Sequence, residues 1–138
     1  AEPESVIELH GSIHRIRCLD CGTVFDAAEF DEVEPGIEPA CPVCGGMLKE
    51  GTISFGQSLE PQVLRRGLEA SRRSRLMLVV GSTLIVNPAA KMPRIAEQSG
   101  ASIAIVNNEP TPLDSLASFV AIAPAGPALE YLADLVGA

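Results

Sequence analysis

No stretch of this chain stays apolar over the roughly 20 residues that a membrane-spanning helix needs. The N-terminus also lacks the basic segment, followed by an apolar one, that marks a secretory signal peptide. We therefore expect no membrane partner and a location in the cytoplasm. The chain begins with Ala rather than Met, so we also expect a fragment or a processed product.

Positive charge is scarce, since 10 Lys and Arg stand against 18 Asp and Glu and the formal net charge is -8. Binding to a nucleic-acid backbone relies on clustered basic residues, so we expect no direct nucleic-acid partner. A local basic cluster consists of Arg65, Arg66, Arg72, Arg73 and Arg75. A solvated helix face explains this cluster most simply, and a surface that attracts acidic tails or phosphates is the alternative.

The composition is otherwise that of a folded protein, with 46% hydrophobic and 20% charged residues. A length of 138 residues suits one ordinary domain but is small for an enzyme with two substrates. Residues 5–9 predict a short strand or an extended lead-in that ends at His10 and Gly11. From Ile13 to Phe55, Gly, Pro and Cys break short alternating runs, which indicates a small turn-rich module with little core of its own.

The remainder alternates between strand and helix patterns, which is typical of a parallel α/β sheet with right-handed crossovers. Residues 76–80 form a continuous apolar run, as in a strand buried on both faces. The apolar side of the last helix should face the core through Leu129, Leu132, Leu135 and Val136. The predicted elements are helices at 61–73, 88–99 and 126–136 and strands at 76–80, 101–106 and 119–123. Three strands are few for such a sheet, so we expect pairing with strands outside this chain, or self-association through the exposed edge.

Four cysteines are arranged as two Cys-x-x-Cys pairs, Cys18 with Cys21 and Cys41 with Cys44, with nineteen residues between the pairs. This spacing is typical of a tetrahedral structural Zn²⁺ site with four thiolate ligands. Two disulfides and one redox-active pair are the alternatives. The absence of a signal peptide argues against disulfides, and the second matching pair argues against a redox site. A catalytic zinc is not expected, because four thiolates leave no open position for water.

Taken together, several short motifs in this order resemble the sirtuins, the NAD-dependent protein deacylases, over nearly the whole chain. Each motif alone is weak, but their order around a zinc ribbon is specific. The motifs are Glu8-Leu9-His10-Gly11, the two cysteine pairs, Phe55-Gly56, Gly81-Ser82-Thr83-Leu84 with Val86 and Pro88, and Val106-Asn107-Asn108-Glu109.

The resemblance implies that His10 is the general base that deprotonates a ribose hydroxyl of NAD⁺. An imidazole is largely neutral at pH 7 and so can accept a proton. In this family NAD⁺ is a consumed co-substrate: it reacts with an acylated lysine of a protein or peptide, and the products are nicotinamide, deacylated lysine and O-acyl-ADP-ribose. His14 matches no family motif, and we expect it to be structural.

The nucleotide-binding residues implied by the resemblance follow predicted strands, at the sheet edge where α/β proteins usually bind ligands. Ser and Thr there could also simply satisfy the turn. The implied contacts to NAD⁺ are Gly81, Ser82, Thr83, Asn107, Asn108, Glu109 and Ala125.

Ile53, Ser54, Phe55 and Gly56 resemble the extended segment along which sirtuins bind the substrate peptide as an added strand. The family pattern here is two Val residues, a bulky residue, Phe, Gly and Glu. This chain departs from it with Thr52, Ile53, Ser54 and, in place of Glu, Gln57. These departures bear on substrate preference.

The Gly-Ala-Gly loop and the Gln-Asn-Ile-Asp motif, which precede the catalytic histidine in sirtuins, have no match here. We therefore expect this chain to be the C-terminal part of the catalytic domain, active only together with the missing N-terminal half. The expected fold class is α/β, a partial Rossmann-like sheet with an inserted zinc ribbon. The expected divisions are a catalytic-histidine segment at 1–12, a zinc-ribbon module at 13–54 and part of the NAD-binding domain at 55–138.

The expected function is NAD-dependent protein deacetylation, or deacylation more broadly. One alternative is a zinc-containing module that binds peptides or a partner without catalysis. Another is ADP-ribosyl transfer from the same NAD⁺ site, since a fold does not determine the acceptor.

Overall fold

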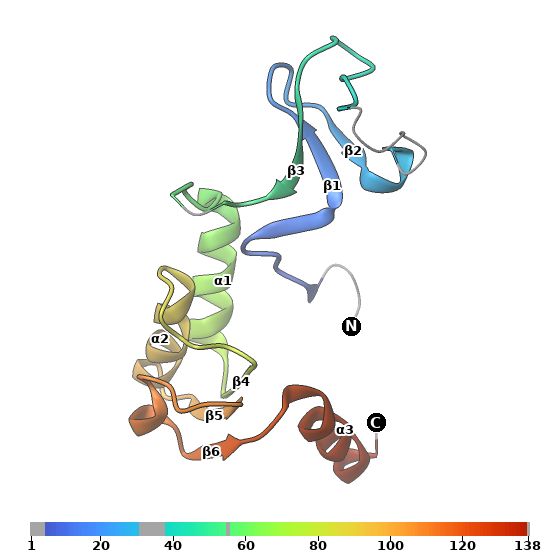
Figure 1. Cartoon of the computed structure of the whole chain (residues 1–138). Coiled ribbons are helices and arrows are strands. Elements are labelled where there is room, and N and C mark those ends of the chain that lie inside the picture. Colours follow the sequence, from blue (N-terminus) through green and yellow to red (C-terminus); the bar gives the residue numbers. More distant parts are fainter. Residues whose placement is uncertain (1–4, 31–37, 55, 138) are drawn as a thin grey trace. The chain divides into compact units, whose positions relative to one another are not determined.

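The computed structural model describes residues 5–30, 38–54 and 56–137 (Figure 1). The chain divides into two units, Ala1–Val63 and Leu64–Ala138, called here the zinc unit and the sheet unit. The three-part division predicted from the sequence remains a prediction. Within the described residues, no helix combines the length and the apolar character that crossing a membrane requires.

The zinc unit is built on a three-stranded antiparallel sheet with the order β2-β1-β3. Its strands are β1 (Gly11–Cys18), β2 (Val24–Asp26) and β3 (Leu48–Thr52), and the short 3-10 helix η2 (Ala27–Phe30) follows β2. Ile16 of β1 lies opposite Phe25 of β2 and Glu50 of β3. Of the described hydrophobic residues in this unit, Cys18 and Cys41 are the buried ones, so the cysteine cluster takes the place of a core.

The strand or extended lead-in predicted for residues 5–9 is not a strand in the structure. Instead, the chain turns at Leu9 and His10, and β1 starts where the prediction ended, at Gly11. Backbone hydrogen bonds from Leu9 to Ile7 and from Gly11 to Glu8 close this turn locally. This turn directs the chain into β1, so the sheet begins at Gly11.

The sheet unit contains a parallel sheet with the order β4-β5-β6. Its strands are β4 (Leu76–Val80), β5 (Ser102–Asn107) and β6 (Phe119–Ile122). The helices are α1 (Pro61–Arg73), which begins at the end of the zinc unit, α2 (Met92–Gln98) and α3 (Ala125–Val136), with 3-10 turns η3 (Ala89–Lys91) and η4 (Asp114–Leu116). Each predicted strand and helix of this part is present, and the predicted α/β class is confirmed.

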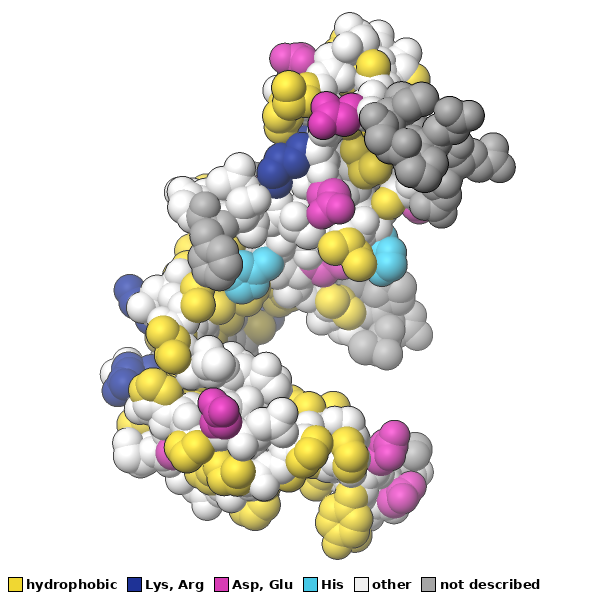
Figure 2. Space-filling model, viewed as in Figure 1, with side chains coloured by type: hydrophobic (Ala, Val, Ile, Leu, Met, Phe, Trp, Pro, Cys, Tyr) yellow, Lys and Arg dark blue, Asp and Glu magenta, His cyan; other side chains and the backbone are white. Residues whose placement is uncertain are grey.

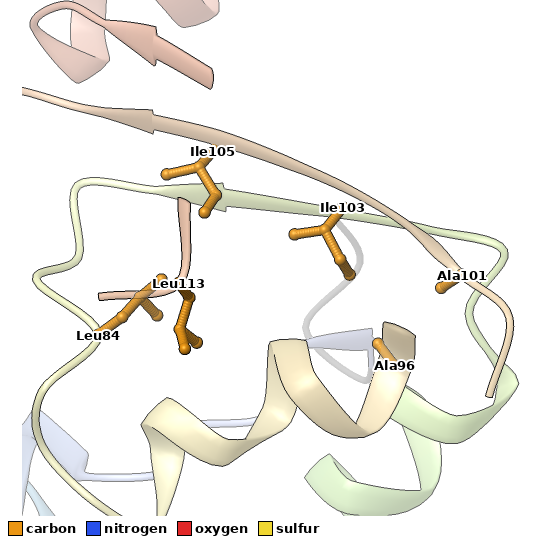
Figure 3. Packing of buried hydrophobic residues seen from close by; sticks show 6 residues of the cluster. All are labelled: Leu84, Ala96, Ala101, Ile103, Ile105 and Leu113. Atoms are coloured by element: carbon orange, nitrogen blue, oxygen red, sulfur yellow. The ribbon is translucent and has the colours of Figure 1, made fainter. Parts of the chain in front are cut away.

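The core of the sheet unit lies between one face of the sheet and α2. Figure 3 shows Ile103 and Ile105 of β5 pointing from the sheet toward the helix that carries Ala96, with Leu84 and Leu113 closing one end. Ile105 and Ala96 are fully buried. Alternate residues of β5 point to this side, as the period-two geometry of a strand requires.

Apart from the buried Val106, the opposite face of the sheet is largely open to solvent, contrary to the prediction that residues 76–80 are covered on both faces. Leu76 is 63% exposed, and Leu78 and Phe119, which share this face, are exposed as well. The prediction that the apolar side of α3 faces the core is also wrong, because Leu129, Leu135 and Val136 are exposed. A parallel sheet needs a covering layer on each face, and the described residues supply a complete one on the α2 side alone.

Candidate zinc centre and nucleotide-binding edge

The four cysteine sulfurs converge at one end of the zinc unit, with all Sγ atoms within 4.8 Å of one another. Cys18 Sγ lies 3.5 Å from Cys44 Sγ, and Cys21 Sγ lies 3.8 Å from Cys41 Sγ. A tetrahedron with Zn–S bonds of about 2.3 Å has sulfur–sulfur edges of about 3.8 Å. The cysteines are free, since a disulfide would bring two sulfurs to about 2.05 Å. Their arrangement fits a closed structural zinc site.

Each Cys-x-x-Cys pair forms the same backbone turn. Gly22 donates its amide to the carbonyl oxygen of Cys18 at 3.1 Å, and Gly45 donates to Cys41 at 2.7 Å. The two glycines have φ angles of 74° and 75°, in the left-handed region that residues with a Cβ atom rarely adopt. The pairs are therefore two equivalent halves of one site, as their matched sequences predict.

Hydrogen bonds between the turns hold the two halves together. The amide of Leu19 donates to the carbonyl oxygen of Met47 at 2.9 Å, and the amide of Met47 donates to Asp20 Oδ2 at 3.0 Å. Sequence reasoning did not identify Asp20, because an acidic residue between two cysteines carries no distinctive signal. Its contact across the site appears only once the two turns face each other.

The thiols differ in their surroundings, since Cys18 and Cys41 are buried whereas Cys21 and Cys44 are exposed. Hydrogen bonds from the side chain and then the backbone of Thr23 lower the pKa of Cys21 to about 6. The backbone amide of Gly46 lowers the pKa of Cys44, but the neighbouring thiols, led by Cys18, outweigh it and raise that pKa to about 12. Zinc binds thiolates, so metal binding at this site is coupled to proton release.

His10 lies in the turn before β1 and is exposed. Its carbonyl oxygen accepts a hydrogen bond of 2.9 Å from the amide of Ile53, the residue that follows β3. Gly11 pairs with Thr52 in the sheet, which continues the same ladder. The structure therefore brings the predicted catalytic residue against the start of the predicted substrate segment.

The predicted substrate segment forms a turn after Ile53. Ser54 donates its amide to Gln57 Oε1 at 2.9 Å, and the amide of Gln57 donates to the carbonyl oxygen of Ser54 at 3.0 Å. Both backbone polar groups of Ser54 are thus engaged, so a peptide that pairs with Ser54 must first displace Gln57. Gly56 is exposed, and Phe55 lies outside the described residues.

Within the sheet unit, the predicted nucleotide-binding residues gather at the carboxyl end of the strands. Gly81 follows β4, has a φ of 61°, and donates its amide to the carbonyl oxygen of Val106 at 2.9 Å. Ser82 Oγ accepts a hydrogen bond from the amide of Leu84 at 3.3 Å, so the hydroxyl also serves the turn, as the alternative interpretation held. Thr83 is exposed beside it.

The neighbouring strand ends at the same edge. Asn107 is buried, and its Nδ2 donates to the carbonyl oxygen of Glu109 at 2.8 Å, which shapes the loop that carries the exposed Asn108 and Glu109. Ala125 opens α3, and a Cβ atom on Gly81 would lie 3.7 Å from the Cβ atom of Ala125. Residues from three segments thus border one edge, as ligand sites in open α/β sheets do.

Comparison with known proteins shows which family combines a four-cysteine cluster with a ligand-binding edge of a parallel sheet. Residues 1–88 match the family model described as the Sir2 family. The chain belongs to the Sir2 family. The resemblance to sirtuins seen in the sequence motifs is thereby confirmed.

Two relatives carry names that state an activity. The NAD-dependent protein deacylase of Aquifex aeolicus is 41% identical over 117 residues, which is 85% of this chain and 48% of that protein. The NAD-dependent protein deacetylase 2 of Streptomyces coelicolor is 40% identical over 129 residues, 92% of this chain and 54% of that protein. The Sir2-family chain thus spans about half the length of these curated relatives.

Solved structures agree with this assignment. A Sir2 homologue in complex with NAD matches with a TM-score of 0.87 at 34% identity, over 96% of this chain and 51% of that chain. A complex of Sir2 with a p53 peptide and NAD⁺ matches with a TM-score of 0.86 at 31% identity, over 96% and 55%. The fold of this chain is therefore that of the corresponding half of a Sir2 protein.

Proposed function

We propose that this chain forms the zinc-carrying and nucleotide-binding part of an NAD-dependent protein deacylase, of the deacetylase type. The observation that carries the proposal is the edge where Gly81, Asn107 and Ala125 meet at the carboxyl ends of parallel strands. Membership of the Sir2 family and the names of the relatives support the same activity. The substrates are NAD⁺ and a protein or peptide with an acylated lysine.

His10 is proposed as the residue that accepts a proton from a ribose hydroxyl of NAD⁺. Its exposed position leaves the imidazole accessible to a ligand, and its backbone is held by Ile53. Gly81, Ser82, Thr83 and the residues from Asn107 to Glu109, together with Ala125, are proposed to hold the nucleotide. The zinc is proposed to have a structural role, since all four ligand positions are filled by cysteine.

The peptide is proposed to run along residues 53–56, where the turn closed by Gln57 controls access to the backbone of Ser54. We also propose a cytoplasmic location and, through the open face and edge of the sheet, pairing with the rest of the catalytic domain or with a second copy. Exposed apolar side chains on β4, β6 and α3 support the pairing.

Because the chain spans about half the length of its relatives, the test uses two polypeptides. One is the chain alone, and the other joins it to the remaining segment of the Aquifex aeolicus relative. We expect NAD-dependent release of acetyl from a lysine peptide by the joined protein, and a loss of at least about 100-fold in His10→Ala, in line with general-base catalysis. His14→Ala is the matched control, because His14 is an exposed histidine on the neighbouring strand.

Equal activity in the His10 and His14 variants would refute the role of His10. A joined protein that binds acetylated peptide and NAD⁺ without any turnover would favour the non-catalytic binding module. Transfer of ADP-ribose to protein, with no deacylation, would favour the transferase alternative.

A further inference from the structure

A pocket of about 530 Å³ opens beside α2 in the sheet unit. Its walls come from the loop after β4, from η3 and α2, and from the loop after β5. None of the residues proposed to hold zinc, NAD⁺ or the acylated lysine lines it. The pocket is therefore separate from the zinc, nucleotide and lysine contacts proposed above.

One wall is a polar stripe made of Asn87, Lys91, Arg94 and Gln98. Lys91, Arg94 and Gln98 are spaced by three and four positions along η3 and α2, so the helical backbone presents them on one side, and Asn87 lies in the turn before η3. Both charged members are cationic, and the described lining contains no Asp or Glu. Among the described residues, the ion pairs join Arg15 to Glu8 and Arg73 to Glu69, so Lys91 and Arg94 have no anionic partner there.

The other wall is apolar. Leu84 and Leu113 are buried at its base, Ile95 is half-buried, and Ile85 is 66% exposed at the rim. A ligand that fills this space must present a negative group to Lys91 and Arg94 and an apolar group to the leucines. An isolated inorganic anion meets the first requirement alone.

A phosphate group is a poorer match than a carboxylate. Phosphate sites usually combine backbone amides from glycine-rich turns with hydroxyl side chains, and the described lining contains no Gly, Ser or Thr. Neutral amide groups from Asn87 and Gln98 flank the two cations, which suits a polypeptide whose backbone also needs partners.

The charge around the pocket agrees with an acidic partner. Seven of the ten basic residues lie between Leu64 and Gln98, and the acidic residues in that range are Glu69 and Glu97. Figure 2 shows basic side chains at the left edge of the molecule, where Figure 1 places α1 and α2. A chain with a net charge of -8 thus presents a locally positive surface here, which attracts negative segments and repels positive ones.

We propose that this pocket binds an acidic segment of a partner polypeptide, with an Asp or Glu carboxylate on Lys91 and Arg94 and a neighbouring apolar side chain against Leu84 and Leu113. The inference does not depend on deacylation, because it uses none of the residues assigned to that reaction. It predicts that partners are selected by acidic residues next to apolar ones.

The test measures binding of a fluorescent peptide with the sequence Gly-Leu-Asp-Glu-Leu-Gly to the purified chain by fluorescence anisotropy. We expect this peptide to bind at least about tenfold tighter than the isosteric Gly-Leu-Asn-Gln-Leu-Gly. The double variant Lys91→Gln/Arg94→Gln should lose this tenfold preference for the acidic peptide. The control Arg72→Gln/Arg75→Gln removes two exposed cations outside the pocket and should change affinity by less than about twofold.

Ile85→Ser serves as a second variant, since it weakens the apolar wall at an exposed position and leaves the charges in place. Weaker binding in this variant supports the pocket, provided that its far-UV circular dichroism is unchanged. Equal loss in the Arg72/Arg75 control would mean unspecific charge attraction and would overturn the proposal. Equal affinity for the Asn-Gln peptide, or full displacement by millimolar inorganic phosphate, would also overturn it.

Discussion

The carboxylate of Asp20, in the first cysteine pair, accepts a hydrogen bond from the backbone amide of Met47 beyond the second pair. Removing this acceptor in Asp20→Ala should lower the free energy of unfolding of the zinc unit by about 1 kcal/mol, the usual net contribution of one hydrogen bond. Asp20→Asn keeps an acceptor oxygen and should restore most of the loss. Chemical denaturation measures both, with exposed Glu60→Ala as a neutral control.

Zinc removal should unfold one unit and spare the other. The zinc unit has the cysteine cluster in place of a core, whereas the sheet unit packs Ile103 and Ile105 against α2 without any metal. A chelator, or Cys41→Ser, should accelerate hydrogen exchange at the amides of Cys18 and Leu19 and leave that at Ile105 unchanged. Unaltered exchange at Cys18 and Leu19 after metal loss would contradict a structural role.

Gly11 lies so close to β3 that a side chain cannot be added. A Cβ atom there would overlap the carbonyl oxygen of Gly51, and the φ angle is 73°. Gly11→Ala should therefore cost at least about 2 kcal/mol in the free energy of unfolding and shift the neighbouring His10.

Gly126→Ala is the matched control for this substitution. Gly126 lies in the first turn of α3, and beyond its chain neighbours and its own helix an added Cβ would meet no atom within 4 Å. Alanine should change the free energy of unfolding by less than about 1 kcal/mol, because its better helix propensity is offset by crowding of its Cβ against Pro127. If both alanine variants unfolded at the same denaturant concentration, the close approach of Gly11 to β3 would not matter.

Two isoleucines on adjacent parallel strands point to the same face of the sheet but differ in burial. Ile105→Ala removes a fully buried side chain and should cost about 2 to 5 kcal/mol, because it leaves a cavity against α2. Ile122→Ala removes one that is 56% exposed and should cost less than about 1 kcal/mol. Equal costs in the isolated chain would indicate that Ile122, on the edge strand β6, is covered in solution.

The features predicted from the sequence are those that local pattern determines. The apolar run from Leu76 to Val80 and the two cysteine pairs carry their own signals, and each lies where expected. The exposure of Leu129 and Val136 was not predictable, because an amphipathic pattern shows which side is apolar but not whether another layer is present. Thr23 was missed as well, although a hydroxyl two residues after Cys21 is a usable signal.

The hydrogen bond from Ser54 to Gln57 has an electrostatic consequence. A glutamate, as in the family pattern at this position, would offer the same kind of acceptor oxygen to the amide of Ser54, so glutamine preserves the turn. What it removes is one full negative charge beside the segment proposed to receive the peptide. The local field there is closer to neutral, and acidic side chains near the acylated lysine meet less repulsion than a carboxylate at position 57 would impose.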